Sequence, residues 1–388
     1  MKKFLALALA ALMLAVMLPV TALADNTPIA VLDFTTMDTT ENTADHWKWD
    51  KDTKTLTLSG SDITAQIILP DGATIVLQAG TTNTIRTYAT AGGMGLVGYG
   101  LSVEKSAEES AKDYGSAKIR GTGSLEVIDI GSFDWNPLIY GSFTFGDKGA
   151  GGPRVKMIRT TQKNGTVTGE IVVNSGNVTV MGEADSCSAF LSENIVVNGG
   201  SLELSGSFGA AWATVTVTGG TAKLKSALAQ GETAGAGLYV GSINVTGGTL
   251  WLVGNNVDYG AALLTAAPNA EAMTVLGSTA YDDPTPSQDV TWAGDGGVRA
   301  CIGDIPARTL KITAAGAPGG GEDPINPPPE EEPTVPGTIT IIVPSNEETP
   351  KPAEDQKNPA TGAHDFVGVA AAAAVMALLG SAVVLRKK

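Results

Sequence analysis

The sequence predicts an all-β solenoid, in which short strands wind into stacked coils around one shared apolar core. Two observations support this fold class. Apolar and polar residues alternate over short stretches, and alternation with a period of two is typical of half-buried strands. These stretches recur every 20 to 28 residues with glycine at the same place in each copy, and this interval is typical of solenoid repeats.

The repeat is clearest in four segments of ten residues each. Every copy has an apolar-x-apolar triplet, a polar-glycine corner and a second apolar-x-apolar triplet. The copies are 171–180, 195–204, 215–224 and 243–252, so their starts lie 24, 20 and 28 residues apart. One coil cannot bury its apolar side alone, whereas stacked coils pair their backbones in parallel and share a core. We expect such coils from Thr55 to Ala315.

The corner of the repeat has its own chemistry. Glycine at the corner predicts a positive φ or a close approach between backbones; these glycines are Gly176, Gly200, Gly220 and Gly248. One flanking position carries Asn174, Asn198, Thr218 and Thr246, and another carries Asn177, Ser201, Thr221 and Thr249. Stacked polar side chains form hydrogen-bonded ladders along an axis. An antiparallel β-sandwich is the main alternative, but corners and ladders in phase favour the solenoid.

The pattern resembles the right-handed parallel β-helices of the pectate-lyase kind, as found in carbohydrate-binding surface proteins of Gram-positive bacteria. The resemblance implies that the coils are right-handed. A solenoid needs a cap at each end. The segment 46–58 is typical of a hairpin with a charged turn, and it places Trp47 and Trp49 on one face. We therefore expect residues 25–54 to cap the first coil, with both tryptophans packed for structure and ligand stacking as the second interpretation.

The first 24 residues have the parts of a secretory signal peptide. Lys2 and Lys3 precede an apolar run over 4–20, and a small-x-small ending follows at Ala22 and Ala24. These are the basic, apolar and cleavage regions of such a peptide. Cleavage is expected after Ala24, and a membrane-anchor helix is the alternative.

An extended linker is expected over 316–357. These 42 residues hold 10 of the 20 prolines together with nine acidic side chains. A segment of this composition cannot bury enough apolar surface to fold, and its prolines and charges extend it. The linker is suited to act as a spacer.

The C-terminal end combines a pentapeptide, an apolar stretch and a basic tail. The pentapeptide is Asn358-Pro359-Ala360-Thr361-Gly362, the apolar stretch covers 366–385 and the tail is 386–388. Twenty apolar residues in a helix span a bilayer core. The order resembles the sorting signal of Gram-positive cell-wall proteins, although the usual motif begins with leucine. The resemblance implies that a sortase cuts between Thr361 and Gly362 and joins Thr361 to peptidoglycan. A plain membrane anchor is the alternative.

Charge and cysteine content exclude several classes of protein. The chain has 25 basic and 40 acidic residues and a net charge of −15, and it has two cysteines. An acidic protein repels phosphate, so a nucleic-acid partner is not expected, and two cysteines cannot staple a chain of this length. Cys187 and Cys301 lie several coils apart, roughly 20 Å along the axis, so we expect two free thiols.

Catalytic motifs are scarce. With two histidines in the chain, a Ser-His-Asp or Cys-His nucleophile is hard to build. The acidic residues Asp282, Asp283, Asp289 and Asp295 are candidate ligands for Ca²⁺, which prefers clustered carboxylates in loops. Polygalacturonate-cleaving β-helices resemble this layout, with Arg299 or Arg308 as the basic residue. Paired carboxylates for glycoside hydrolysis and a solvated loop are the alternatives, and Asp129 and Asp134 share this ambiguity.

Aromatic residues provide the candidate binding site. Position 251 is the outward position of its triplet, where the other copies have Thr179, Glu203 and Lys223. We therefore expect Trp251 to lie exposed on a flat sheet, with Trp212, Tyr239 and Tyr259 in neighbouring loops. Exposed aromatic rings bind the apolar faces of sugars, and packing under a loop is the alternative.

Together these features predict a secreted, non-catalytic surface protein of a Gram-positive cell wall. We expect carbohydrate binding or adhesion, with sortase, peptidoglycan and an extracellular glycan as partners. No cofactor is expected apart from the candidate Ca²⁺, and the membrane is contacted transiently through the C-terminal helix. A polysaccharide lyase or glycoside hydrolase acting on acidic glycans and a passive structural rod are the alternatives.

Overall fold

The computed structural model describes residues 30–88, 99–105, 114–131, 137–160, 165–182, 188–227, 235–294 and 297–316. The chain divides into two compact units, Met1–Asn326 and Pro327–Lys388, and every described residue belongs to the first. The expected signal peptide, sorting motif and membrane span, and the linker after Gly316, lie outside the described residues. The described ranges contain no helix that is long and apolar enough to cross a membrane.

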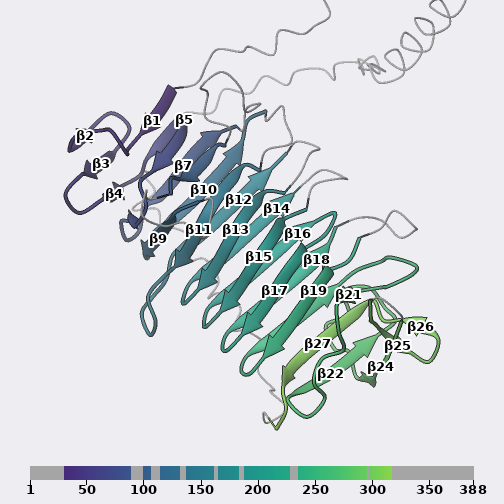
Figure 1. Ribbon diagram of the computed structural model, residues 1–388. Helices are drawn as coiled ribbons and strands as arrows, with labels where there is room; N and C mark the ends of the chain where they lie inside the picture. Colours follow the sequence, from purple (N-terminus) through teal and green to yellow (C-terminus); the bar gives the residue numbers. More distant parts are fainter. Residues whose placement is uncertain are drawn as a thin grey trace, which may run out of the picture. The chain divides into compact units, whose positions relative to one another are not determined.

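The described chain is all-β, and most of its strands pair in parallel in two stacks (Figure 1). Stack A consists of β5 (Asp62–Leu69), β8 (Leu101–Val103), β11 (Ile139–Phe145), β13 (Val167–Val173), β15 (Phe190–Val197), β17 (Ala210–Val217), β19 (Leu238–Val245) and β21 (Ala262–Leu264). Stack B consists of β7 (Thr82–Thr87), β10 (Ser124–Asp129), β12 (Arg154–Arg159), β14 (Asn177–Gly182), β16 (Ser201–Gly206), β18 (Thr221–Ser226) and β20 (Thr249–Val253). The chain alternates between the stacks, as a solenoid does.

The register confirms that the four repeat segments stack in phase. In stack A, Ile195 pairs with Ile171 in β13 and with Val215 in β17. In stack B, Leu202 pairs with Val178 in β14, and the same alignment continues through β18 and β20. Because all of these pairings are parallel, the antiparallel sandwich is wrong for this part of the chain.

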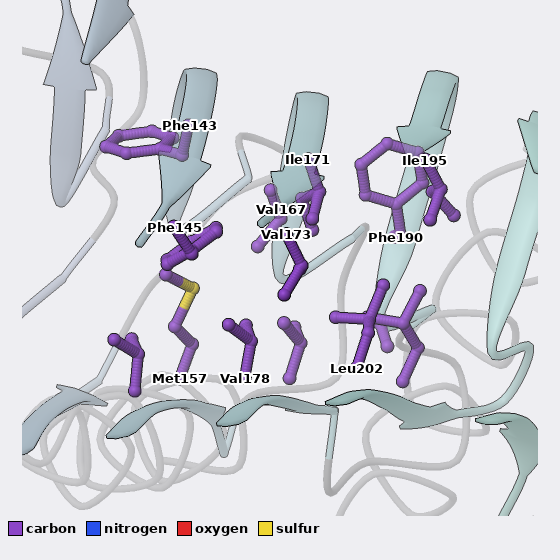
Figure 2. Close-up of a cluster of buried hydrophobic side chains, with 14 of the residues drawn as sticks. Phe143, Phe145, Met157, Val167, Ile171, Val173, Val178, Phe190, Ile195 and Leu202 are labelled. Carbon is purple, nitrogen blue, oxygen red and sulfur yellow. The ribbon is translucent and has the colours of Figure 1, made fainter. Parts of the chain in front are cut away.

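The core lies between the two stacks. Phe143, Ile171 and Ile195 of stack A are at most 1% exposed. Figure 2 shows them in a row on successive strands, opposite Met157 and Leu202 of stack B. Each such side chain contributes about 1.5–3 kcal/mol through its burial. The alternation in the sequence therefore places one apolar layer from each stack against the other.

The corners between the stacks match the predicted chemistry. The corner glycines have φ values between 67° and 88°; they are Gly176, Gly200, Gly220 and Gly248. The first ladder is confirmed from Asn174 to Thr218, because the Asn198 amide donates to Asn174 Oδ1 at 3.0 Å and Thr218 Oγ1 donates to Asn198 Oδ1 at 2.7 Å. In the second ladder, Ser201 Oγ donates to Asn177 Oδ1 at 2.9 Å.

Antiparallel strands precede the coils. β2 (Thr40–Asn42), β3 (Trp47–Asp50) and β4 (Thr55–Leu58) form a meander. β4 then pairs in parallel with β6 (Ala73–Leu77), and β6 pairs with β9 (Ser116–Gly121). β1 (Ala30–Asp33) pairs in parallel with β5. Trp47 and Trp49 are 5% and 1% exposed, so both rings are packed inside.

The parallel coils end earlier than the expected boundary at Ala315. After β21 the chain forms β22 (Met273–Ser278), β23 (Gln288–Asp289) and β27 (Thr309–Ala314), and β27 pairs antiparallel with β20 and β22. A separate antiparallel sheet contains β24 (Thr291–Ala293), β25 (Arg299–Ile302) and β26 (Ile305–Pro306). The repeat pattern is absent from these residues, and an antiparallel strand covers the last open edge of stack B, which would otherwise template further pairing.

Candidate functional site

The strands of stack A bend near their midpoints, and this bend positions the candidate site. In β11 the first residues, Ile139 and Tyr140, pair with β8, whereas the chain from Ser142 onward pairs with β9. Gly141 lies between them with a φ of 150°, and its partner in β13, Gly169, has a φ of 129°. Glycine adopts positive φ without a steric penalty. We call this position in each strand the stack A bend.

The next three strands carry larger residues with positive φ at the stack A bend or, in β15, one residue beyond it. Glu193 in β15, Trp212 in β17 and Val240 in β19 have φ values of 83°, 54° and 50°. Positive φ is uncommon for any residue with a side chain and is a true outlier for a β-branched one. Strain of this kind costs about 1–3 kcal/mol per residue and is concentrated at functional sites. The bend is therefore a candidate functional position.

Three aromatic side chains gather around Tyr239, and we call these four residues the aromatic cluster. The ring centroid of Tyr239 lies 4.9 Å from that of Phe208, 6.1 Å from that of Trp212 and 5.6 Å from that of Tyr259. Trp212 is 58% exposed, and Tyr239 and Tyr259 are half-buried. The cluster thus presents a partly exposed aromatic surface on stack A.

One member of the aromatic cluster lies in a short connection. The chain passes from β16 to β17 through 207–209 alone, whereas the connections on either side cover 183–189 and 227–237. Phe208 lies in this short connection and was not predicted as a site residue. The signal that could have found it is a repeat spacing of 20 residues, the shortest of the three.

Polar groups accompany the aromatic rings. Burial, together with Tyr239 and Asp258 nearby, raises the pKa of Tyr259 to about 12, so its hydroxyl is protonated at neutral pH and can donate a hydrogen bond. One or two residues beyond the positive-φ residue, each strand of stack A from β11 to β19 has a polar side chain, and these side chains lie in register. This polar row is Ser142, Glu170, Asn194, Thr214 and Ser242. An aromatic surface beside polar groups suits sugars, which have apolar faces and many hydroxyls.

The structure brings three of the four predicted aromatic residues together and leaves Trp251 elsewhere. Trp251 lies in β20 of stack B and pairs with Lys223, so it faces outward as predicted. Its ring is half-buried and not fully exposed. The cause is β27, which pairs with β20 and places the Lys311 ammonium 5.3 Å from the ring centroid.

The predicted calcium ligands have other partners. Asp282 accepts from Lys223 Nζ and Lys225 Nζ, both at 2.6 Å, and Asp283 Oδ1 accepts from the backbone N–H of Thr285 at 2.8 Å. Asp289 is exposed in β23, and Asp295 lies outside the described residues. Within the described ranges no three His, Cys, Asp or Glu side chains are grouped to hold a metal ion. The calcium site stays a prediction.

The Asp282 ion pairs are expected to make stability depend on pH. Burial acts to raise the pKa of Asp282, but hydrogen bonds from Lys223 and Lys225 outweigh burial and lower it. The stabilisation is therefore complete above the unfolded-state pKa of about 4 and is lost as pH falls through the lower folded-state value. Asparagine tolerates the positive φ at position 282, so Asp282→Asn should test the ion pairs alone. It should lower the free energy of unfolding by about 1–3 kcal/mol at pH 7.

Thermal denaturation between pH 3 and pH 7 checks this prediction. The Asp282→Asn variant should lose less stability than the parent on acidification, and Asp289→Asn, at an exposed position, should follow the parent. Parallel curves for all three proteins would contradict the role of Asp282.

Two residues singled out in the sequence, Asp129 and Cys301, are buried. Asp129, a candidate acid, is buried with its Oδ2 4.0 Å from Arg159 Nε, and both side chains are 0% exposed. Asp134 lies outside the described residues. Cys301 is a free, buried thiol, and Cys187 lies outside the described residues.

Arg299, the candidate base of the lyase alternative, has another partner. It donates from Nη1 to the Asp258 carbonyl at 2.5 Å.

The arrangement on stack A thus offers binding chemistry, with rings and hydrogen-bonding groups, on strands held in register by the solenoid. Comparisons of the chain with protein-family models, with curated proteins and with solved structures found no match.

Proposed function

We propose that this chain is a non-catalytic surface protein that binds carbohydrate through the aromatic cluster. One observation carries the proposal: Trp212 is 58% exposed at a φ of 54° and in contact with Tyr239. A large exposed side chain at a strained backbone position costs stability and adds little burial. Function explains its presence better than folding does, and an aromatic ring beside polar groups is suited to sugars.

The proposed location is the cell wall of a Gram-positive bacterium. It rests on the signal-peptide pattern over 1–24, the motif over 358–362 and the apolar stretch and basic tail that follow. In this proposal a sortase joins Thr361 to peptidoglycan, the membrane is contacted transiently, and the coils are right-handed. Mass spectrometry of protein released from cell walls should find Thr361 as the C-terminal residue, and a chain that retains 363–388 would reject sortase anchoring.

Replacing Trp212 with alanine is expected to weaken carbohydrate binding about tenfold. A ring contact contributes about 0.5–1.5 kcal/mol beyond its area, and 1.4 kcal/mol corresponds to a factor of ten. A glycan array identifies the ligand, and titration calorimetry measures the affinity of parent and variant.

Trp251→Ala is the matched control, because it removes the same type of side chain from stack B. It should bind like the parent. If no glycan binds the parent, the passive rod is favoured; if Trp251→Ala loses binding and Trp212→Ala does not, the site lies on stack B.

A further inference from the structure

We infer, building on the proposed function, that the ligand is an extended, uncharged glycan chain lying along the solenoid axis over β15 to β21. The alternative ligands are a single sugar and an acidic polysaccharide. Three features of stack A lead to this inference: the direction of the aromatic cluster, the direction of the polar row, and the carboxylates at both ends of this surface.

The aromatic cluster follows the axis. Trp212 belongs to β17 and Tyr239 to the next strand, β19, while Tyr259 lies in the connection that leads to β21. Successive strands of a stack lie about 4.8 Å apart along the solenoid axis. The ring centroids follow one another at 6.1 Å from Trp212 to Tyr239 and at 5.6 Å from Tyr239 to Tyr259. Rings placed on successive strands contact successive parts of a long ligand, and a single sugar cannot reach all of them.

The polar row runs beside the cluster in the same direction. Asn194 and Thr214 are exposed and Ser242 is half-buried, on β15, β17 and β19. Ser242 Oγ donates to Thr214 Oγ1 at 3.1 Å, and the Asn194 amide donates to Glu170 Oε1 at 3.4 Å. These hydrogen bonds orient the row along the axis, and each group keeps further donor or acceptor capacity. A chain of sugars on the rings would have hydroxyls facing this row.

We call the surface formed by the aromatic cluster and the polar row the track. The track is covered toward β11. Tyr114 is 4% exposed and Ser142 is 8% exposed. The Tyr114 hydroxyl donates to Glu193, and its ring packs edge-on against Tyr140 with centroids 5.4 Å apart. The polar row is therefore open from Asn194 onward, and a bound chain ends near Glu193.

The charges at the track select against acidic glycans. Glu193 and Glu170 lie at its covered end, Asp258 adjoins Tyr259, and the chain as a whole has a net charge of −15. Like charges on a ligand and its site disfavour binding. Arg299 is nearby but donates to the Asp258 carbonyl. An uncharged chain avoids the repulsion, and its hydroxyls can donate to the carboxylates.

Titration calorimetry on the full chain tests the inference with three series of probes. The probes are uncharged N-acetylglucosamine oligomers and glucose oligomers of one to six units, and galacturonate oligomers of the same lengths. Affinity for the better uncharged series should rise about tenfold from one unit to four, as a second ring contact is added, and then level off. The galacturonate series should bind more weakly at every length.

Two variants examine the row and the charge. Thr214→Val removes a hydroxyl while keeping the side-chain shape, so the rise in affinity from one sugar unit to four should become smaller. Thr216→Val, on the same strand but outside the polar row, should leave that rise unchanged. Glu193→Gln should improve galacturonate binding relative to the parent. Melting temperatures of all variants should stay close to that of the parent.

The outcomes distinguish this inference from the proposed function. Equal affinity for one and four units, or stronger binding of galacturonate than of uncharged oligomers, would overturn this inference while leaving carbohydrate binding intact. Absence of binding to every oligomer would overturn the proposed function and this inference with it.

Discussion

Replacing Gly220 with alanine is expected to lower the free energy of unfolding by about 2–5 kcal/mol. Gly220 has a φ of 69°, which costs a residue with a Cβ about 1–2 kcal/mol. The added Cβ would also lie 2.3 Å from the carbonyl oxygen of Gly200 on the preceding coil. That oxygen belongs to the backbone of the stack, so relief requires the coils to separate, and overpacking of this kind costs about 1–3 kcal/mol more.

Gly80→Ala is the matched control for this prediction. Gly80 has a φ of 71°, close to that of Gly220, but no atom lies within 4 Å of an added Cβ. It should show the conformational cost alone, reduced by the lower entropy of the unfolded chain. Urea denaturation of both variants measures the difference. Equal losses would mean that the close approach between coils does not matter.

Replacing Arg159 with methionine is expected to lower the free energy of unfolding by about 3–5 kcal/mol. Arg159 and Asp129 are both fully buried, with Nε 4.0 Å from Oδ2, and Arg159 Nη1 also donates to the Gly165 carbonyl at 2.8 Å. Removing the guanidinium leaves a buried carboxylate without its counter-charge. An unpaired buried charge is far more costly than a buried pair.

The double variant Asp129→Leu with Arg159→Met provides the control. Replacing a buried ion pair by apolar side chains of similar size is often neutral or stabilising, so the double variant should recover most of the lost stability in the same denaturation experiment. A double variant as unstable as Arg159→Met alone would show that packing, and not charge, causes the loss.

The sequence alone predicted the coils and their corners because both depend on local, repeated chemistry. Alternating residues identify the inward face of each strand, and the glycine at positions such as Gly200 identifies a corner that other residues cannot form. Asn174 and Asn198 recur in phase, which already indicates that they stack. Each of these features needs neighbours within one repeat or one repeat away.

The remaining features depend on contacts that no local pattern encodes. The ion pair between Asp129 and Arg159 and the packing of Lys311 over Trp251 join residues 30 and 60 positions apart. The alternation of β17 already places Trp212 outward, but only the pairing of β17 with β19 brings it beside Tyr239. Residue type and spacing therefore determined which part of the chain winds into coils, whereas the register between coils and the antiparallel strands after β21 decided which aromatic rings meet. The reason is physical: backbone pairing between coils sets side-chain neighbours across the stack, and those neighbours are not adjacent in sequence.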